Sequence, residues 1–347
     1  MSIKRTLPLE RRNSLGALLG VAPIASPDES REVPLSPAPR DATQRRVVVA
    51  LLGLYTLWFR YTRDVCSRHT PWGPRWLANA LSLLLTRTLH YSGSPLKSVR
   101  LPDPPIDPTK QHLVVWHPHG AYTCMAFGHC AYQAFSKSPL FWNTAVTPVL
   151  FRIPILRELL LLFGARSVHS SVVSSLVAAG ANVGIQPGGV PEQLQADHRR
   201  EVAHFPPRLG FIRLAMKHGI PLLPAYVFGE NQAYTTLGEV GRVFSRAIFR
   251  VTGVPFVPVL GKWKLPWLVP RNGDIHIRWG QPVGVGPPND NPTDAQVEQV
   301  FAAYVQALQA VFEAHKYDCL PADVAAKGLT ISLRAGAHRS VSPRSRL

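Results

Sequence analysis

The fold is decided by one short stretch of the chain, Leu113-Val114-Val115-Trp116-His117-Pro118-His119-Gly120. Its four consecutive apolar side chains predict a buried strand over residues 111–116, and the proline and glycine end that strand abruptly. The two histidines therefore fall at the carboxyl end of a strand, where open α/β sheets bind their ligands. Because neutral imidazole accepts a proton near pH 7, this edge of the sheet is suited to removing a proton from a substrate.

The chain beyond this stretch alternates between helical and strand patterns. Strands are predicted over residues 182–186, 220–228 and 274–279, and helices over residues 154–163, 172–179 and 209–218. Gly219 is expected to cap the last of these helices. A final helix is predicted to begin at the capping-box pair Thr293 and Gln296 and to continue to about His315. The alternation predicts an α/β fold, with a sheet flanked by helices, in a catalytic domain spanning residues 93–331.

Two apolar segments precede that domain. The first, Val47 to Phe59, has about 13 residues, fewer than the roughly 20 that a perpendicular membrane span needs. The second, Trp76 to Leu85, follows the Pro- and Gly-rich break at residues 71–74. Basic and aromatic residues punctuate both segments, as in interfacial anchors. We expect residues 46–92 to form a membrane-associated helical hairpin, and the alternative is a pair of ordinary core helices.

The charge of the chain restricts its partners. Thirty-eight Lys and Arg against 21 Asp and Glu give a formal net charge of +17, which calls for an anionic surface or ligand. The charge is spread along the chain, and zinc-finger spacing and aromatic RNA-binding signatures are missing, so no nucleic-acid partner is predicted. A membrane surface together with a phosphorylated co-substrate is favoured. Residues 1–45 and 332–347 have the composition of disordered tails.

The two histidines admit three interpretations: catalysis, metal binding, or packing and capping. Cys124, His129 and Cys130 lie close by in sequence and raise the possibility of zinc. Structural zinc sites use two separated pairs of ligands, and the sequence has no second pair, so no metal is predicted. The four cysteines form no CxxC motif in a chain too large to need disulfides, and we expect them to be reduced.

A second motif, Gly188-Gly189-Val190-Pro191-Glu192, follows the predicted strand at residues 182–186. Two glycines let backbone N–H groups approach a ligand, so Gly188, Gly189 and Gly120 are candidates for holding an oxyanion. A carboxylate at Glu192 could fix the tautomer of a histidine and stabilise its imidazolium form. The alternative is a simple turn with a glutamate at the start of a helix.

A third segment, residues 208–231, combines a basic helix with the strand and loop that follow it. Arg208, Arg213 and Lys217 offer a face that could bind the phosphates of a co-substrate, although a solvated basic helix face would look the same. The Gly-x-Ser-x-Gly elbow of serine hydrolases is absent, as are the nucleotide-binding glycine patterns.

In this order, the three motifs resemble the type-2 diacylglycerol and monoacylglycerol acyltransferase family. The resemblance covers about residues 95–331 and includes Gly280 to Val283, Pro292-Thr293 and the end of the last helix near His315-Lys316. Its signature residues here are Pro118, Gly210, Phe211, Gly219, Pro224, Phe228, Gly229, Glu230 and Asn231.

The resemblance implies a glycerolipid-acyltransferase-like fold and an acyl-CoA-dependent O-acyltransferase. Such an enzyme transfers a fatty acyl group to diacylglycerol or monoacylglycerol at the endoplasmic reticulum or lipid droplets, and acyl-CoA is a co-substrate, so no cofactor is expected. His117 and His119 would take the active-site role, with Glu192 as their carboxylate partner. A lipid hydrolase, a wax-ester or sterol acyltransferase and a non-catalytic lipid-binding protein stay open, as does a peroxisomal address at Ser345-Arg346-Leu347.

Overall fold

A computed structural model describes residues 42–91, 107, 109–123, 141–266, 270–271 and 275–333. The chain divides into two compact units, residues 1–58 and 59–347, which are treated separately below. Most of each predicted tail lies outside the described residues. The expected domain boundary at residues 92–93 and the cysteines Cys124 and Cys130 also lie outside them.

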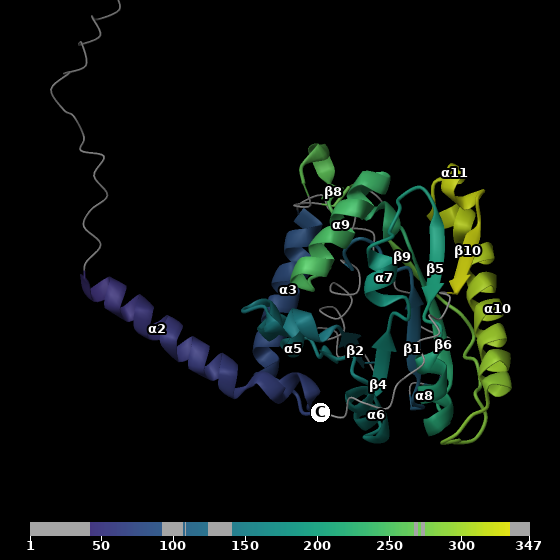
Figure 1. The fold of residues 1–347 in the computed structure, drawn as a ribbon, viewed down its shortest axis with the longest axis horizontal. Coiled ribbons are helices and arrows are strands. Elements are labelled where there is room, and N and C mark those ends of the chain that lie inside the picture. The colour runs from purple at the N-terminus through teal and green to yellow at the C-terminus, as the bar shows by residue number, and fades with distance from the viewer. Residues whose placement is uncertain are drawn as a thin grey trace, which may run out of the picture. The chain divides into compact units, whose positions relative to one another are not determined.

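The second unit is built on a six-stranded sheet in the order β3-β2-β4-β1-β6-β9 (Figure 1). The strands are β1 Leu113–His117, β2 Trp142–Val146, β3 Arg166–Ser167, β4 Asn182–Ile185, β6 Leu222–Phe228 and β9 His276–Trp279. Five of them are parallel, and β9 runs antiparallel to β6. Strand β1 lies between β4 and β6, and both of these neighbours run parallel to it.

Two further pairs of strands lie outside this sheet. Strand β5 (Glu201–Phe205) pairs in parallel with β10 (Leu329–Leu333), and β7 (Thr235–Thr236) pairs antiparallel with β8 (Val259–Leu260). None of these four strands is predicted from the sequence. Residues far apart in the chain thus build β5 and β10 into one ladder beside α10 (Figure 1).

The helices alternate with the strands, as the sequence predicted. They are α5 Leu156–Leu162, α6 Ser170–Ala178, α7 Gly189–Gln193, α8 Gly210–His218, α9 Gly238–Thr252, α10 Asp294–Cys319 and α11 Ala322–Ala325, with the 3₁₀ turns η1 Arg63–Ser67, η3 Pro148–Arg152, η4 Asn231–Ala233 and η5 Lys262–Lys264. Thr293 and Gln296 form the predicted capping box at α10, and Gly219 caps α8 with a φ of +65°. The predicted α/β class is confirmed.

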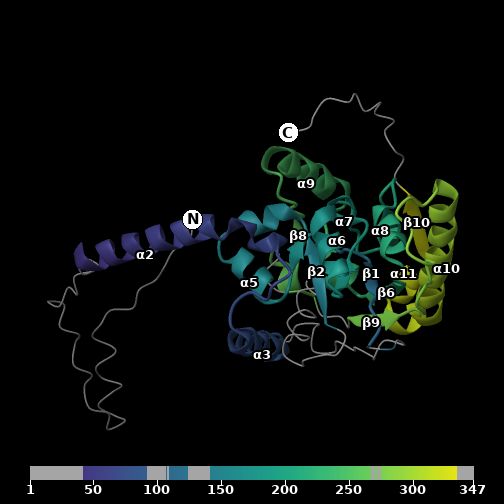
Figure 2. The ribbon, with the colours of Figure 1, turned by 90° about the horizontal axis from the view of Figure 1, so that it is seen from below.

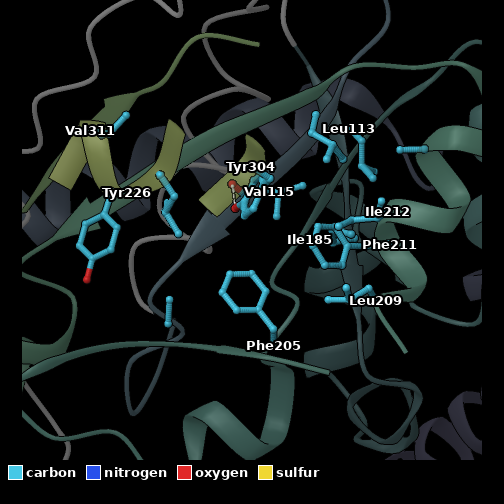
Figure 3. Close-up of a cluster of buried hydrophobic side chains, with 14 of the residues drawn as sticks. Leu113, Val115, Ile185, Phe205, Leu209, Phe211, Ile212, Tyr226, Tyr304 and Val311 are labelled. Carbon is cyan, nitrogen blue, oxygen red and sulfur yellow. Dashed lines mark hydrogen bonds between the residues drawn. The ribbon is translucent and has the colours of Figure 1, made fainter. Parts of the chain in front are cut away.

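Alternate side chains of β1 enter two different cores, as the pleat of a strand requires. Leu113 and Val115 join a core with residues of α6, α8 and α10, whereas Val114 and Trp116 face the other side of the sheet. In the first core, the hydroxyl of Tyr304 donates to the carbonyl of Val115 at 3.3 Å (Figure 3). Helix α10 packs on β6 at this face of the sheet, and Figure 2 shows α10 beside β10 at one side of the second unit. Position 117 therefore points to the same side as Val115.

Both N-terminal apolar segments are helical, in α2 (Ala42–Tyr61) and α3 (Arg75–Tyr91). The apolar side chains of α2 are exposed, Val49 and Leu54 to more than 60%. Neither α2 nor any other helix in the described part of the chain combines the length and apolar character that crossing a membrane requires. Within the second unit, the buried Arg157 donates to the carbonyl of Phe59 and to the hydroxyl of Thr62.

Candidate functional site

The centre of the site is the meeting of β1 with the turn after β4. His117 is the last residue of β1, and Glu192 lies in α7, seven residues beyond the end of β4. Because β1 and β4 are parallel neighbours, the segments that follow them emerge at the same edge of the sheet. The first and second sequence motifs are thereby brought together, as predicted.

Glu192 holds both histidines of the first motif. Its Oε1 accepts from Nδ1 of His117 at 3.4 Å and from the backbone N–H of His119 at 3.0 Å, and its Oε2 lies 3.3 Å from the same imidazole nitrogen. The side chain of Glu192 is only 4% exposed. A buried carboxylate is stable only with such partners, so this pairing fixes the backbone after Pro118 as well as the imidazole.

The two imidazoles differ in their surroundings. His117 is fully buried, and its ring lies 4.8 Å from that of Phe205. Since its Nδ1 donates to Glu192, its Nε2 is left as an acceptor, which is buried and finds no hydrogen-bond partner among the described residues. The arrangement is that of a histidine oriented by a carboxylate, with its second nitrogen unoccupied.

His119 is partly exposed and its ring is not bonded to Glu192. Its Nδ1 lies 3.3 Å from the carbonyl of Gly120, which can only accept, so Nε2 is the basic nitrogen of this ring. Removal from water lowers the pKa of His119, against the smaller opposing effect of Glu192. His119 is therefore neutral at pH 7 and able to accept a proton.

The glycines of both motifs have distinct roles. A Cβ on Gly188 would overlap the carboxylate of Glu192, so only glycine fits there. Gly120 has a φ of +67° and leaves room for the side chain of Glu230. A Cβ at position 120 would lie only 2.7 Å from Cγ of Glu230. The N–H of Gly189 donates to the carbonyl of Gln186 at 3.1 Å and is engaged in the turn.

The residues of the third motif divide between the site and the core. Phe228 ends β6 and is fully buried, and Gly229, Glu230 and Asn231 follow it beside Gly120. Phe211 stacks on Phe205, the ring that contacts His117. The remaining signature residues are structural: Gly210 begins α8, Gly219 ends it against Pro288, and Pro224 pairs with Val115 across the sheet.

The basic residues of α8 are engaged elsewhere. Arg213 pairs with Asp294 and donates to the carbonyl of Pro292, and Lys217 lies 3.7 Å from Asp290. Lys217 is in the last turn of α8, just before β6 begins, so it lies at the edge of the sheet opposite the histidines. Arg208 precedes α8 near the histidine edge and is exposed.

A buried glutamate that the sequence analysis did not single out supports the third motif. Glu201 of β5 accepts from the hydroxyl of Tyr226 at 2.7 Å and from the side-chain amides of Asn231 and Gln232 at 2.9 and 2.7 Å. Burial, with a contribution from the negative charge of Glu192, raises the pKa of Glu201 to about 7, although its hydrogen bonds act in the opposite direction. An acidic residue among the apolar side chains of residues 201–205 was the signal available in the sequence.

A small cavity, open to solvent, adjoins Glu192. Its lining includes Pro118, Asp197, Arg200, His204 and Asn231. Asp197 is buried and lies within ion-pair distance of Arg199, Arg200 and Arg242. Burial raises the pKa of this carboxyl, but the hydrogen bonds from Arg199 and the charges of Arg199 and Arg200 keep the pKa below its usual value. The lining thus combines the carboxylates of Glu192 and Asp197 with one arginine, Arg200.

The described residues contain no group of three or more His, Cys, Asp or Glu side chains that could hold a metal ion. Cys124, His129 and Cys130, the neighbours that raised the possibility of zinc, lie outside the described residues. The chemistry that the described site offers is that of an acid–base pair at a strand end.

Known proteins that are similar to this chain are acyltransferases. The family model described as diacylglycerol acyltransferase matches residues 44–324. A Dictyostelium discoideum diacylglycerol O-acyltransferase 2 is 31% identical over 226 residues, covering 61% of this chain and 68% of the relative. The human acyl-CoA wax alcohol acyltransferase 2 is 31% identical over 245 residues (65% and 72%), and bovine 2-acylglycerol O-acyltransferase 1 is 31% identical over 225 residues (61% and 67%).

No solved structure matches the chain. The family match covers the histidine motif, the Gly-Gly-x-x-Glu turn and the segment from Arg208 to Asn231, so the resemblance stated from the sequence is confirmed. The chain belongs to the diacylglycerol acyltransferase family.

Proposed function

We propose that the protein transfers a fatty acyl group from acyl-CoA to the free hydroxyl of diacylglycerol or monoacylglycerol and makes triacylglycerol from the former. Membership of the family supports the reaction class, and relatives named for diacylglycerol and 2-acylglycerol acylation support the acceptor. The observation that carries the proposal is the single buried carboxylate of Glu192 holding both His117 and His119.

In the proposed mechanism, Nε2 of His119 accepts the proton of the acceptor hydroxyl as its oxygen attacks the thioester carbonyl. The C–S bond then breaks, and the imidazolium returns the proton to the CoA thiolate, which leaves as the thiol. His119 is preferred as the base because its ring is partly exposed, and His117 is the alternate because its carboxylate pairing is also suited to this role. Proton transfer of this kind contributes about 10²- to 10⁴-fold in rate.

Negative charge develops on the carbonyl oxygen of the tetrahedral intermediate. We assign its stabilisation to backbone N–H groups at Gly120 and Gly188, since that of Gly189 already donates to Gln186. One such donor contributes roughly 3 kcal/mol to the transition state. The phosphates of CoA are assigned to Arg208, which is exposed near the histidine edge, and to Arg200, which lines the cavity and shares the single carboxylate of Asp197 with Arg199 and Arg242. Arg213 and Lys217 each have a carboxylate partner of their own.

Both substrates are lipids, so the enzyme must work at a membrane. We propose that residues 46–92 form a helical hairpin inserted in one leaflet and that residues 93–331 adopt the glycerolipid-acyltransferase type of α/β fold. The exposed apolar side chains of α2 support the first assignment, and the parallel sheet with histidines at a strand end supports the second. The proposed location is the endoplasmic reticulum membrane, with lipid droplets as a second site.

The reaction is tested with purified protein and labelled oleoyl-CoA. The acceptors are diacylglycerol, monoacylglycerol, a long-chain alcohol and a sterol, each offered in turn, and the lipids formed are separated. Labelled triacylglycerol from diacylglycerol is the expected result, and its loss in Glu192→Gln protein would assign it to this site. Free oleate as the main product with every acceptor present would instead identify a hydrolase. A long-chain alcohol preferred over both acylglycerols would assign the wax-ester activity for which one relative is named.

The location is tested by imaging the tagged full chain together with markers for endoplasmic reticulum, droplets and peroxisomes. The expected signal follows the endoplasmic reticulum. A carrier protein fused to the final residues, ending Ser345-Arg346-Leu347, is expected to stay diffuse in the cytosol. Its import into peroxisomes would transfer the assignment to that organelle.

A further inference from the structure

Helix α9 has its apolar face turned outward. Val240, Phe244 and Val251 follow helical spacing along the chain and are 79%, 51% and 86% exposed, with Leu237 and Val243 beside them. The inner face of the same helix is formed by the small buried residues Gly241 and Ser245. A surface helix of a water-soluble protein usually turns its apolar side chains toward the core and its polar side chains toward solvent. An exposed apolar stripe of this length marks an interaction surface.

A loop tip extends this apolar face. Residues 262–265 read Lys-Trp-Lys-Leu, and Trp263 and Leu265 are 69% and 46% exposed. The tip is closed by a hydrogen bond from the N–H of Gly261 to the carbonyl of Leu265, and Trp263 has the left-handed φ of +57° that side chains avoid. The fold therefore holds an indole outward.

The chain leading to the tip packs on α9, so the two form one surface. The ring of Phe256 meets that of Phe244 edge-on at 6.4 Å, and Gly241 leaves room for Pro258. In both ribbon views α9 lies at the border of the second unit (Figures 1 and 2). We call the exposed apolar residues of α9 together with residues 262–265 the α9–tip surface.

The charges on this surface are basic. Arg246, Arg250, Lys262 and Lys264 surround the apolar stripe, and the one acidic residue of α9, Glu239, is paired with Arg242 and Arg246. Apolar side chains with an exposed tryptophan, bordered by arginine and lysine, are the composition of helices that lie in the interface of an anionic bilayer. The exposed indole and the excess of arginine and lysine over acidic residues together favour a lipid surface over a protein partner.

We infer that the α9–tip surface docks the second unit on the surface of an anionic phospholipid bilayer, in addition to any anchoring by the N-terminal helices. Arg242, on the inner side of α9, pairs with Asp197, and Asp197 lines the cavity beside Glu192. The docking helix is thus joined to the wall of that cavity by one ion pair. The inference goes beyond the proposed reaction, because measuring it requires neither acyl-CoA nor an acceptor.

A local measurement is needed because the exposed side chains of α2 can also bind lipid. The full-length protein and its Trp263→Phe variant are mixed with vesicles of 70% phosphatidylcholine and 30% phosphatidylserine, with or without brominated acyl chains, which quench a tryptophan on contact. Trp263 is one of eight tryptophans, so the difference between the two proteins isolates its signal. The brominated vesicles are expected to quench that difference signal, and an unquenched signal would overturn the inference.

Partitioning provides an independent test. A Val240→Ser/Val251→Ser variant is expected to partition into the same vesicles about tenfold more weakly than wild type. The matched control is Val168→Ser/Tyr317→Ser, which removes exposed apolar side chains from other faces and should leave partitioning unchanged. Equal partitioning of the α9 variant and wild type would contradict the inference. If light scattering also shows that wild type is a dimer and the α9 variant a monomer, the surface is instead a contact between two copies of the chain.

Discussion

Glu192 and His117 lie 75 residues apart in the chain, yet the carboxylate of one lies 3.3 Å from the imidazole of the other in a buried space. The same carboxylate accepts the N–H of His119. One side chain thus sets the tautomer of the first histidine and the backbone position of the second, and loss of that side chain affects both.

The two histidines are distinguished by their pH dependence. We expect His119→Ala to lower kcat by about 10²- to 10⁴-fold and to abolish the rise of kcat/KM with pH. In wild type that rise should occur below pH 6.5, the ordinary pKa of histidine, because burial lowers the pKa of His119 and the neutral form is the base. His117→Gln should lower kcat but keep the pH profile, and the exposed His69→Ala should change neither. A profile lost only in the His117 variant would reverse the two roles.

Gly188→Ala tests the position of the carboxylate without removing it. The added Cβ would overlap Glu192, so the carboxylate must move away from both histidines, and we expect kcat to fall about 10²-fold. Gly284→Ala is the control, because a Cβ there meets nothing within 4 Å. Steady-state rates of the two folded variants are compared, and equal rates would show that Glu192 need not occupy its present position.

Glu201 makes stability depend on pH. Its pKa is about 7 when folded, against 4.5 for an ordinary glutamate, so the folded protein holds a proton that the unfolded chain has lost over this interval. The corresponding stabilisation is present below pH 4.5 and is lost as the pH rises to 7, by roughly 3 kcal/mol. The Glu201→Gln protein should lack this loss. Denaturant unfolding of both proteins at pH 5 and pH 8 measures it, and parallel changes in the two would contradict the assignment.

Variants of Arg200 and Arg213 distinguish a role in binding acyl-CoA from a role in stabilising the fold. Arg200→Ala should raise the KM for acyl-CoA several-fold with little change in kcat, since Arg200 lines the cavity beside Glu192. Arg213→Ala should leave that KM unchanged and lower the free energy of unfolding by about 1 kcal/mol, because Arg213 ties α8 to the segment before α10. A raised KM in the Arg213 variant would restore α8 as the phosphate-binding face.

The meeting of His117 with Glu192 could be predicted from the sequence because it depends on local patterns. Each residue follows a short apolar strand, and parallel strands end at one edge of a sheet. The counter-ions of Arg213 and Lys217 could not be predicted, since Asp294 at the start of α10 and Asp290 in the loop before it lie more than 70 residues away. Two of the three basic residues of the expected face, Arg213 and Lys217, consequently have carboxylate partners.

Long-range pairing also explains the missed support of the site. Glu201 belongs to β5, whose partner β10 lies near the end of the described chain. A local hydrophobic pattern does not reveal the pairing of two parallel strands that lie so far apart in the sequence. Helix α9 was missed for a different reason. Its apolar residues face outward and mix with arginines, so the expectation that apolar residues mark a core face does not apply.

The ladder between β5 and β10 has a consequence for biosynthesis. Residues 201–205 carry Glu201 and Phe205, which support Asn231 and His117, yet their partner strand is translated more than 120 residues later. While residues 329–333 are still inside the ribosome, the nascent chain presents β5 with an open edge. The strand that carries Glu201 and Phe205 is therefore paired only after residues 329–333 have left the ribosome.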